Sequence, residues 1–216
     1  MRFIRNWYQL LEGSGLAASD SGPGQAAGTL SSDVTWAPFY HPPGTIYTYK
    51  GVVIGASQSR IVSAAAAGFT PLAGSIEMLI KPTWNYTDGA THIFWNTGGG
   101  AGKYFRLLKF SDGLTYLSTN SLTRGSFSYP WAAGTIYHVV LNWGTNELWI
   151  NGVLANDYTD GTLGAGASTL YIGDSASLAN ASFSGDIYYF IVRDVALTAA
   201  EIATFKAFFE NQYIPD

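Results

Sequence analysis

The segment NELWINGVLAND (residues 146–157) contains the clearest local signal for the fold. Leu148 and Ile150 alternate with Glu147 and Trp149, which is the period of a β-strand whose two faces meet different surroundings. Asn151 and Gly152 follow, and both residue types tolerate the positive φ that a tight hairpin turn requires. The segment therefore predicts an antiparallel β-hairpin.

Short strand-like segments, separated by turn residues, recur along the rest of the chain. They are YTYKGVVIG (47–55), SIEMLIKP (75–82), KYFRLLKF (103–110), LTYLST (114–119), TIYHVVLNW (135–143), TLYIG (169–173) and DIYYFIVR (186–193). About ten short strands at such spacing predict an all-β sandwich or barrel. The N-terminal MRFIRNWYQLLEGSG lacks the continuous apolar run of a secretion signal, so a first strand is expected to begin almost at Met1.

One helix is predicted at the end of the chain, at about residues 198–210. Thr198 and Glu201 form a capping box, in which each side chain binds a free backbone N–H group of the first turn. Ile202, Phe205 and Phe209 follow at helical spacing and should dock against a sheet. No linker, repeat or low-complexity tract interrupts the sequence, so we expect a single domain over residues 1–216.

The composition narrows the classes of partner. Charged residues make up 12% of the chain, against about 25% in typical soluble domains, and the net charge is −4. The eleven Lys and Arg residues are scattered, which excludes a nucleic-acid footprint, and no apolar run approaches the ~18 residues that cross a membrane. A neutral, aromatic-rich surface favours sister subunits, lattice contacts or glycans, so we expect a homo-oligomer or a lattice-bound protein.

Five segments, in order, resemble the concanavalin A-like jelly roll, in its laminin-G-like branch. They are LLEGSGLAASDSGPGQAAGTLSSDVTW (10–36), SIEMLIKP (75–82), AGTIYHVVLNW (133–143), ELWINGV (147–153) and FSGDIYYFIVRDVALTAAEI (183–202). The resemblance implies a jelly-roll sandwich of two antiparallel sheets with one C-terminal helix. The family includes lectins, carbohydrate-binding modules, adhesion domains, glycoside hydrolases and phage virion proteins, so the fold alone does not fix the function.

Hydrolysis is not expected. A retaining glycosidase needs two carboxyl groups about 5–5.5 Å apart, which the enzymes of this family carry close together on one strand. Here Glu77 and Glu147 each stand alone on a predicted strand. His138 lies opposite an apolar stripe and is predicted to be a hydrogen-bonded structural residue. The protein is therefore expected not to be an enzyme.

Calcium is the one cofactor that the sequence leaves open. The resemblance implies a site near the loop that contains Asp20, completed by an acidic residue in the last strand. That second position falls on Tyr188 or Tyr189, with Asp186 one step off, so a turn-forming Asp20 without metal is the favoured alternative.

Glycan binding requires exposed aromatic rings and a few polar groups beside them. The loop PTWNYTDGATH (82–92) offers Trp84, Tyr86 and Asp88, and Trp131 offers a further ring. The alternative is that these aromatic residues pack beneath a loop or at a subunit contact.

Two functions remain after these exclusions. One is a non-catalytic structural protein of a virion surface, of the phage capsid decoration or fibre type, which packs against the viral capsid or sister subunits and binds cell-surface glycans weakly. The other is a secreted, extracellular carbohydrate-binding module or lectin. The absence of a recognisable secretion signal ahead of the first predicted strand favours the virion interpretation.

Overall fold

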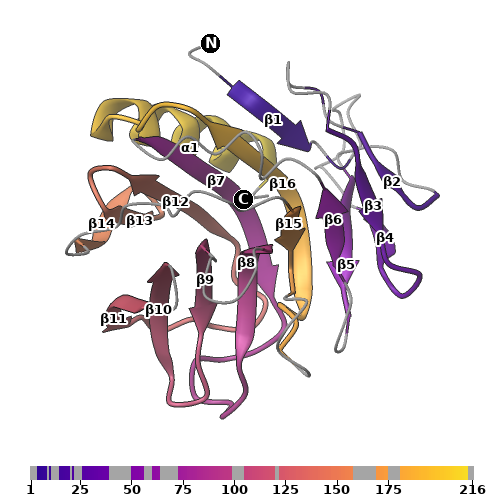
Figure 1. The fold of residues 1–216 in the computed structure, drawn as a ribbon, viewed down its shortest axis with the longest axis horizontal. Coiled ribbons are helices and arrows are strands. Elements are labelled where there is room, and N and C mark those ends of the chain that lie inside the picture. The colour runs from indigo at the N-terminus through magenta and orange to yellow at the C-terminus, as the bar shows by residue number, and fades with distance from the viewer. Residues whose placement is uncertain are drawn as a thin grey trace.

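Two antiparallel β-sheets, packed face to face, form the body of the protein (Figure 1). The structure is a computed structural model, and it describes residues 4–8, 10, 15–19, 21, 26–38, 50–55, 60–63, 73–98, 105–119, 122–157, 169–174 and 181–213. Every strand pair recorded among these residues is antiparallel, as the sequence predicts. The predicted segments 47–49 and 103–104 and residue Asp20 lie outside the described part of the chain.

The first sheet has the order β14-β13-β12-β7-β16-β5-β4, and β1 also pairs with β16. Its strands are β1 (Ile4–Tyr8), β4 (Thr35–Pro38), β5 (Lys50–Ile54), β7 (Gly74–Pro82), β12 (Tyr137–Trp143), β13 (Glu147–Ile150), β14 (Val153–Asp157) and β16 (Gly185–Arg193). The strand expected near Met1 is thus β1.

The second sheet has the order β11-β10-β9-β8-β15-β6-β3-β2. Its strands are β2 (Ala17–Ala18), β3 (Gly28–Leu30), β6 (Ile61–Ser63), β8 (His92–Gly98), β9 (Phe105–Lys109), β10 (Leu114–Thr119), β11 (Leu122–Ser128) and β15 (Thr169–Ile172). Each sheet thus combines strands that are far apart in the sequence.

The hairpin predicted from residues 146–157 is present as β13 and β14. Leu148 and Ile150 are buried, whereas the residues that alternate with them are partly exposed. Asn151 and Gly152 both have positive φ, at 51° and 75°, which is the backbone of a mirror-image turn that matches the twist of the strands.

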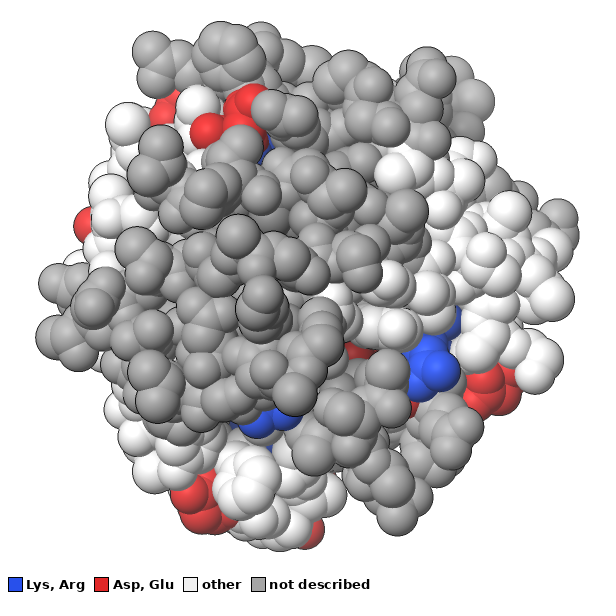
Figure 2. Space-filling model, viewed as in Figure 1, with Lys and Arg blue, Asp and Glu red and all other residues white. Residues whose placement is uncertain are grey.

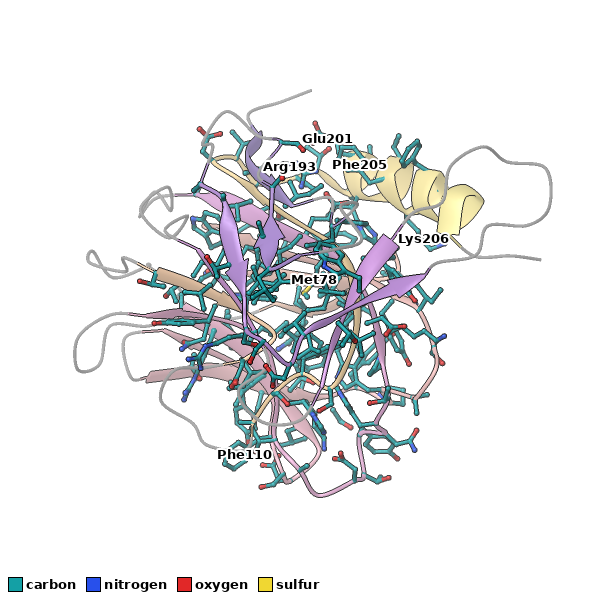
Figure 3. All side chains as sticks on the ribbon, turned by 90° about the vertical axis from the view of Figure 1, so that its right-hand side faces the viewer. Met78, Phe110, Arg193, Glu201, Phe205 and Lys206 are labelled. Atoms are coloured by element: carbon teal, nitrogen blue, oxygen red, sulfur yellow. The ribbon has the colours of Figure 1, made fainter. Side chains whose placement is uncertain are left out.

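The hydrophobic core lies between the two sheets. It contains Ile76, Met78 and Ile80 from β7, and Val139 and Leu141 from β12. Figure 3 shows Met78 near the middle of the molecule. These residues occupy alternate positions of their strands, so the opposite faces of β7 and β12 point away from the core.

Helix α1 (Ala199–Tyr213) covers that outer face of the first sheet (Figure 1). The predicted capping box is present, because the Glu201 carboxylate accepts from the Thr198 backbone N–H at 2.9 Å and the Glu201 N–H donates to Thr198 Oγ1 at 3.3 Å. Ile202 is fully buried against Val140 of β12, and Phe205 packs partly buried beside it. The side chain of Phe209 lies outside the described part.

A charged network is buried beneath the helix. Glu77 of β7 is fully buried; one carboxylate oxygen lies 2.9 Å from His138 Nε2, and the other lies 2.5 Å from an Arg193 nitrogen. The Arg193 guanidinium also lies over the Phe205 ring of α1, 5.0 Å from its centroid. Burial by itself would raise the pKa of Glu77, but His138 and Arg193 outweigh it and hold that pKa below its ordinary value. The structural role predicted for His138 is confirmed.

Aromatic side chains close the core at the end of the sandwich where β7 ends. The Trp84 indole stacks on the His92 ring, with centroids 4.2 Å apart and planes within 2°. The Trp131 ring packs edge-on against Trp84, with centroids 6.3 Å apart. Phe94, Phe183 and Tyr137 complete the cluster.

This packing corrects the expectation that Trp84 and Trp131 offer ring faces to a sugar. Trp84 is 5% exposed and Trp131 is 1% exposed. The indole N–H of Trp84 donates to the Phe183 carbonyl, and that of Trp131 donates to Thr115 Oγ1 at 2.9 Å. Their indole N–H groups have hydrogen-bond acceptors inside the protein, so both residues belong to the core. For these two rings the alternative interpretation, packing beneath a loop, is therefore the correct one.

Replacing Glu77 by Gln should strongly destabilise the protein. Arg193 would remain buried without its counter-charge, and breaking such a pair costs about 3–5 kcal/mol. Urea unfolding measures this loss, and Glu147→Gln, at a partly exposed position, should cost below about 1 kcal/mol. Because folding lowers the Glu77 pKa, its contribution is present above the unfolded value near 4.5 and is lost as the pH falls through the folded value. Equal costs at pH 7 for both variants would contradict the buried network.

Truncating Trp84 to Ala should lower the free energy of unfolding by about 3–5 kcal/mol, because a large buried ring leaves a cavity. Tyr86→Ala, two residues away at an exposed position, should change it by about 0.5 kcal/mol or less. Denaturant midpoints of the two purified variants give the comparison. A Trp84→Ala protein as stable as the Tyr86→Ala protein would show that the indole is not part of the core.

Candidate functional site

The loop between β7 and β8 is held firmly to the end of the sandwich. At its start, the Thr83 backbone N–H donates to the Ser184 carbonyl at 3.1 Å. In its middle, the Tyr86 N–H donates to the Trp131 carbonyl at 2.9 Å, and Asn85 Oδ1 accepts from the Ala133 N–H at 3.0 Å. Tyr86 is 38% exposed above these anchors. A ring on so constrained a loop loses little further freedom when a ligand binds.

Asp88 organises the second half of this loop. One carboxylate oxygen accepts from the Lys109 ammonium and from the Ala90 N–H, and the other lies 2.6 Å from His92 Nε2. The remaining His92 nitrogen, Nδ1, lies 3.0 Å from the Ser182 carbonyl. These contacts join the loop to β8, to β9 and to the segment that precedes β16.

The electrostatics of this cluster favour an ionised Asp88. Burial alone would raise the pKa of Asp88, but the hydrogen bonds from Lys109, His92 and the Ala90 N–H outweigh burial and lower the pKa below its ordinary value. The Asp88 side chain is 26% exposed, whereas that of Lys109 is fully buried. The negative charge therefore meets solvent and the positive charge does not.

The turn between β9 and β10 lies beside Tyr86. A Cβ atom added at Gly113 would meet the Tyr86 carbonyl oxygen at 3.1 Å, and Gly113 has a φ of +85°, so glycine suits both the turn and the close approach. Phe110, at the start of the turn, is 44% exposed. Its ring meets the Tyr116 ring edge-on, with centroids 5.9 Å apart.

Asp112 at the tip of this turn is exposed and stays ionised. Its carboxylate accepts from the Tyr116 hydroxyl at 2.6 Å and from the Leu114 N–H at 2.9 Å. The Tyr116 hydrogen bond, followed by that of Leu114, lowers the pKa of Asp112, and the nearby Lys109 charge adds to this shift. The same hydrogen bond raises the pKa of Tyr116.

The two loops and Tyr116 of β10 contribute to a surface that we call the rim patch, made of Tyr86, Asp88, Phe110, Asp112 and Tyr116. The sequence predicted Tyr86 and Asp88, and the structure keeps them at the surface. Sequence reasoning missed Phe110, Asp112 and Tyr116. The available signal was an aromatic residue directly before the turn Ser111-Asp112-Gly113, because a large apolar side chain beside a tight turn has little core to enter.

The two carboxylates considered for hydrolysis lie elsewhere. Glu77 is enclosed beneath helix α1 by His138 and Arg193. Glu147 lies on β13 and accepts from the Trp149 indole N–H at 3.2 Å, and β12 separates its strand from that of Glu77. Neither residue belongs to the rim patch.

The described residues do not provide the calcium site that the resemblance implies. Tyr188 and Tyr189 are buried, and Asp186 accepts from the Tyr188 hydroxyl at 3.2 Å. Burial raises the pKa of Asp186, which disfavours the ionised form that calcium needs. Within the described part of the chain, no three His, Asp or Glu side chains gather as metal ligands. Asp20 lies outside it.

Charged side chains form small groups among the described residues of one face. Figure 2 shows these Lys, Arg, Asp and Glu residues as separate small areas of blue and red. In the described residues, no helix is long and apolar enough to span a membrane.

Comparison with solved structures shows the same fold in several proteins. Domain 4 of AbnA, an extracellular arabinanase from Geobacillus stearothermophilus solved in complex with arabinotriose, matches with a TM-score of 0.69 and 15% identity over 94% of this chain and 98% of that domain. A mutant of Trypanosoma rangeli sialidase that displays trans-sialidase activity matches with a TM-score of 0.68 and 14% identity, over 99% of this chain and 34% of that protein.

A structure of botulinum neurotoxin type C, described as depending on two ganglioside molecules for cell entry, matches with a TM-score of 0.67 and 9% identity over 95% of this chain and 51% of that one. This chain therefore spans about a third of the sialidase and about half of the toxin chain. None of the curated proteins matches its sequence.

A family model matches residues 55–203, which is more than half of the chain. It is a laminin G model, described as the concanavalin A-like lectin/glucanases superfamily. The matched range contains the hairpin β13–β14, both loops of the rim patch and the start of helix α1. The chain belongs to the laminin-G-like branch of the concanavalin A-like lectin and glucanase superfamily.

Proposed function

We propose that this protein is a non-catalytic, glycan-binding lectin-like domain and that the rim patch is its sugar-contacting surface. The observation that carries the proposal is the pair of exposed aromatic rings, Tyr86 and Phe110, on adjacent loops of one rim. The carboxylates of Asp88 and Asp112 belong to the same two loops.

The chemistry of the patch suits a carbohydrate. A sugar ring has apolar C–H faces that pack on an aromatic plane and hydroxyl groups around its edge. Tyr86 and Phe110 provide the planes, while ionised carboxylates accept hydrogen bonds from the hydroxyls. The anchors of both loops add affinity, because a surface held in place before binding pays a smaller entropic cost.

The fold neighbours support this class of ligand. The arabinanase domain was solved with arabinotriose, and the toxin structure is described through its interaction with gangliosides. At 15% and 9% identity these matches give no residue of the site, which rests on the geometry of the rim patch alone.

The absence of catalysis is part of the proposal. Glu77 is bound on both oxygens inside the protein, and reaching a substrate would require helix α1 to leave the sheet. The exposed carboxylates of the rim patch are engaged by Lys109, His92 and Tyr116, and their lowered pKa values disfavour the protonated state that a general acid needs.

A second candidate function is packing into an assembly such as a virion surface. It is supported by the terminal strand β14, on which Val153 is 68% exposed and Leu154 is 44% exposed, and by the low charge of the chain. Apolar residues on a sheet edge favour contact with another subunit. Both functions accord with an extracellular or virion-surface location. Sedimentation over a range of concentrations tests whether copies of the chain associate.

Glycan retention tests the proposed function. The purified protein should be screened on immobilised oligosaccharides, arabinotriose among them, and Tyr86→Ala and Phe110→Ala should each weaken retention about ten-fold or more, since stacking residues dominate such surfaces. Phe208→Ala is the matched control, because Phe208 is 54% exposed on helix α1, and should bind like the parent. Incubation with the same glycans should release no reducing ends. Equal retention by all four proteins, or steady release, would contradict the proposal.

A further inference from the structure

The charges of the rim patch are arranged unequally with respect to solvent. The Asp88 side chain is 26% exposed and Asp112 is an exposed residue, whereas the positive charge near them belongs to Lys109, whose side chain is fully buried. The Lys109 ammonium donates to Asp88 and, at 2.9 Å, to the Ala90 carbonyl. It is thus directed into the protein and away from a ligand on the rings.

The other titratable groups of the cluster do not reverse this sign at the surface. His92 is 8% exposed, and its two ring nitrogens face Asp88 and the Ser182 carbonyl. The Tyr116 hydroxyl donates a hydrogen bond to Asp112, and its raised pKa keeps Tyr116 neutral. A ligand that lies across Tyr86 and Phe110 therefore meets two negative charges and no exposed cation among the described residues of the patch.

We propose that the rim patch selects neutral glycans and rejects acidic ones, such as those ending in sialic or uronic acid, with Asp112 as the main residue that sets this preference. The inference rests on the proposed function. Asp112 carries the larger share because its carboxylate is exposed at the tip of a turn, whereas Lys109 offsets the charge of Asp88.

The expected size of the effect follows from Coulomb's law. Two unit charges about 4 Å apart in water repel enough to change an equilibrium constant about five-fold. Screening at physiological salt reduces this value for exposed groups. One carboxylate on a bound sugar should thus weaken binding about two- to five-fold, and the difference should shrink as salt is added.

A pair of matched ligands isolates charge from shape. The neutral polysaccharide that the parent protein retains most strongly is partially carboxymethylated, and a second portion is hydroxyethylated to the same degree. Both substituents are small, but only the first is charged. Affinity electrophoresis or biolayer interferometry then gives the ratio of affinities for the two derivatives.

We expect the parent to prefer the hydroxyethyl derivative about two- to five-fold, and Asp112→Asn to bring this ratio close to one. Asparagine keeps the oxygen that accepts from the Leu114 N–H, so the turn is preserved while its charge is removed. Glu147→Gln is the control for the same change of charge. Glu147 pairs with Asn142, which pairs with Ser75 at the start of β7, whereas the rim patch lies past the end of β7. This variant should keep the parent ratio.

The outcomes separate the inference from the function on which it rests. Retention of neutral glycans by the parent together with an equal or stronger retention of the carboxymethyl derivative would overturn the charge preference and leave glycan binding standing. An unchanged ratio in Asp112→Asn would overturn the role of Asp112. Failure of the parent and all variants to retain any neutral glycan would overturn the proposed function and the inference together.

Discussion

The central strands of this protein must be buried on both faces, and the rest of the structure follows from that constraint. In β7, β12 and β16 nearly every residue is buried, because one face meets the second sheet and the other meets helix α1 or its surroundings. A strand that alternates its side chains cannot hold a charge at such a position without a counter-charge nearby. Glu77, His138 and Arg193 meet that requirement together. The Arg193 guanidinium also lies over the ring of Phe205, which extends their network to the helix.

At the opposite end of the sandwich, near the β7–β8 loop, a buried charge is also balanced by a counter-charge, but by one close to solvent. There the core is closed by aromatic rings, and Lys109 is buried over the Trp84 ring, with its ammonium 5.7 Å from the ring centroid. The counter-charge comes from Asp88, which stays near solvent. Figure 3 shows Phe110 at one end of the molecule and Arg193 with Phe205 at the other. The buried ion pair therefore stabilises one end, while the half-exposed one shapes the candidate binding surface.

Much of the fold could be predicted from local sequence rules, because hairpin turns, alternating strands and helix caps are decided by a few adjacent residues. The turn at Asn151-Gly152 and the cap at Thr198 are examples. The site was harder to predict because burial of a loop residue depends on contacts distant in sequence. Trp84 lies in a polar loop, yet Phe183, about a hundred positions away, accepts its indole N–H group. Lys109 ends a strand and resembles an ordinary surface lysine until the loop of Asp88 is placed against it.

The anchoring of the β7–β8 loop has a consequence for how this surface can diversify. Its backbone is fixed by hydrogen bonds to Ser184 and Trp131 that do not depend on the identity of the exposed side chains. The anchoring hydrogen bond of Tyr86 uses its backbone, so its side chain can be exchanged while the frame beneath it stays in place, whereas the side chains of Asn85 and Asp88 hold the loop and must be kept. The arrangement separates evolvability from stability: new ligand preferences can arise by substitution at the tip, at little thermodynamic expense to the scaffold.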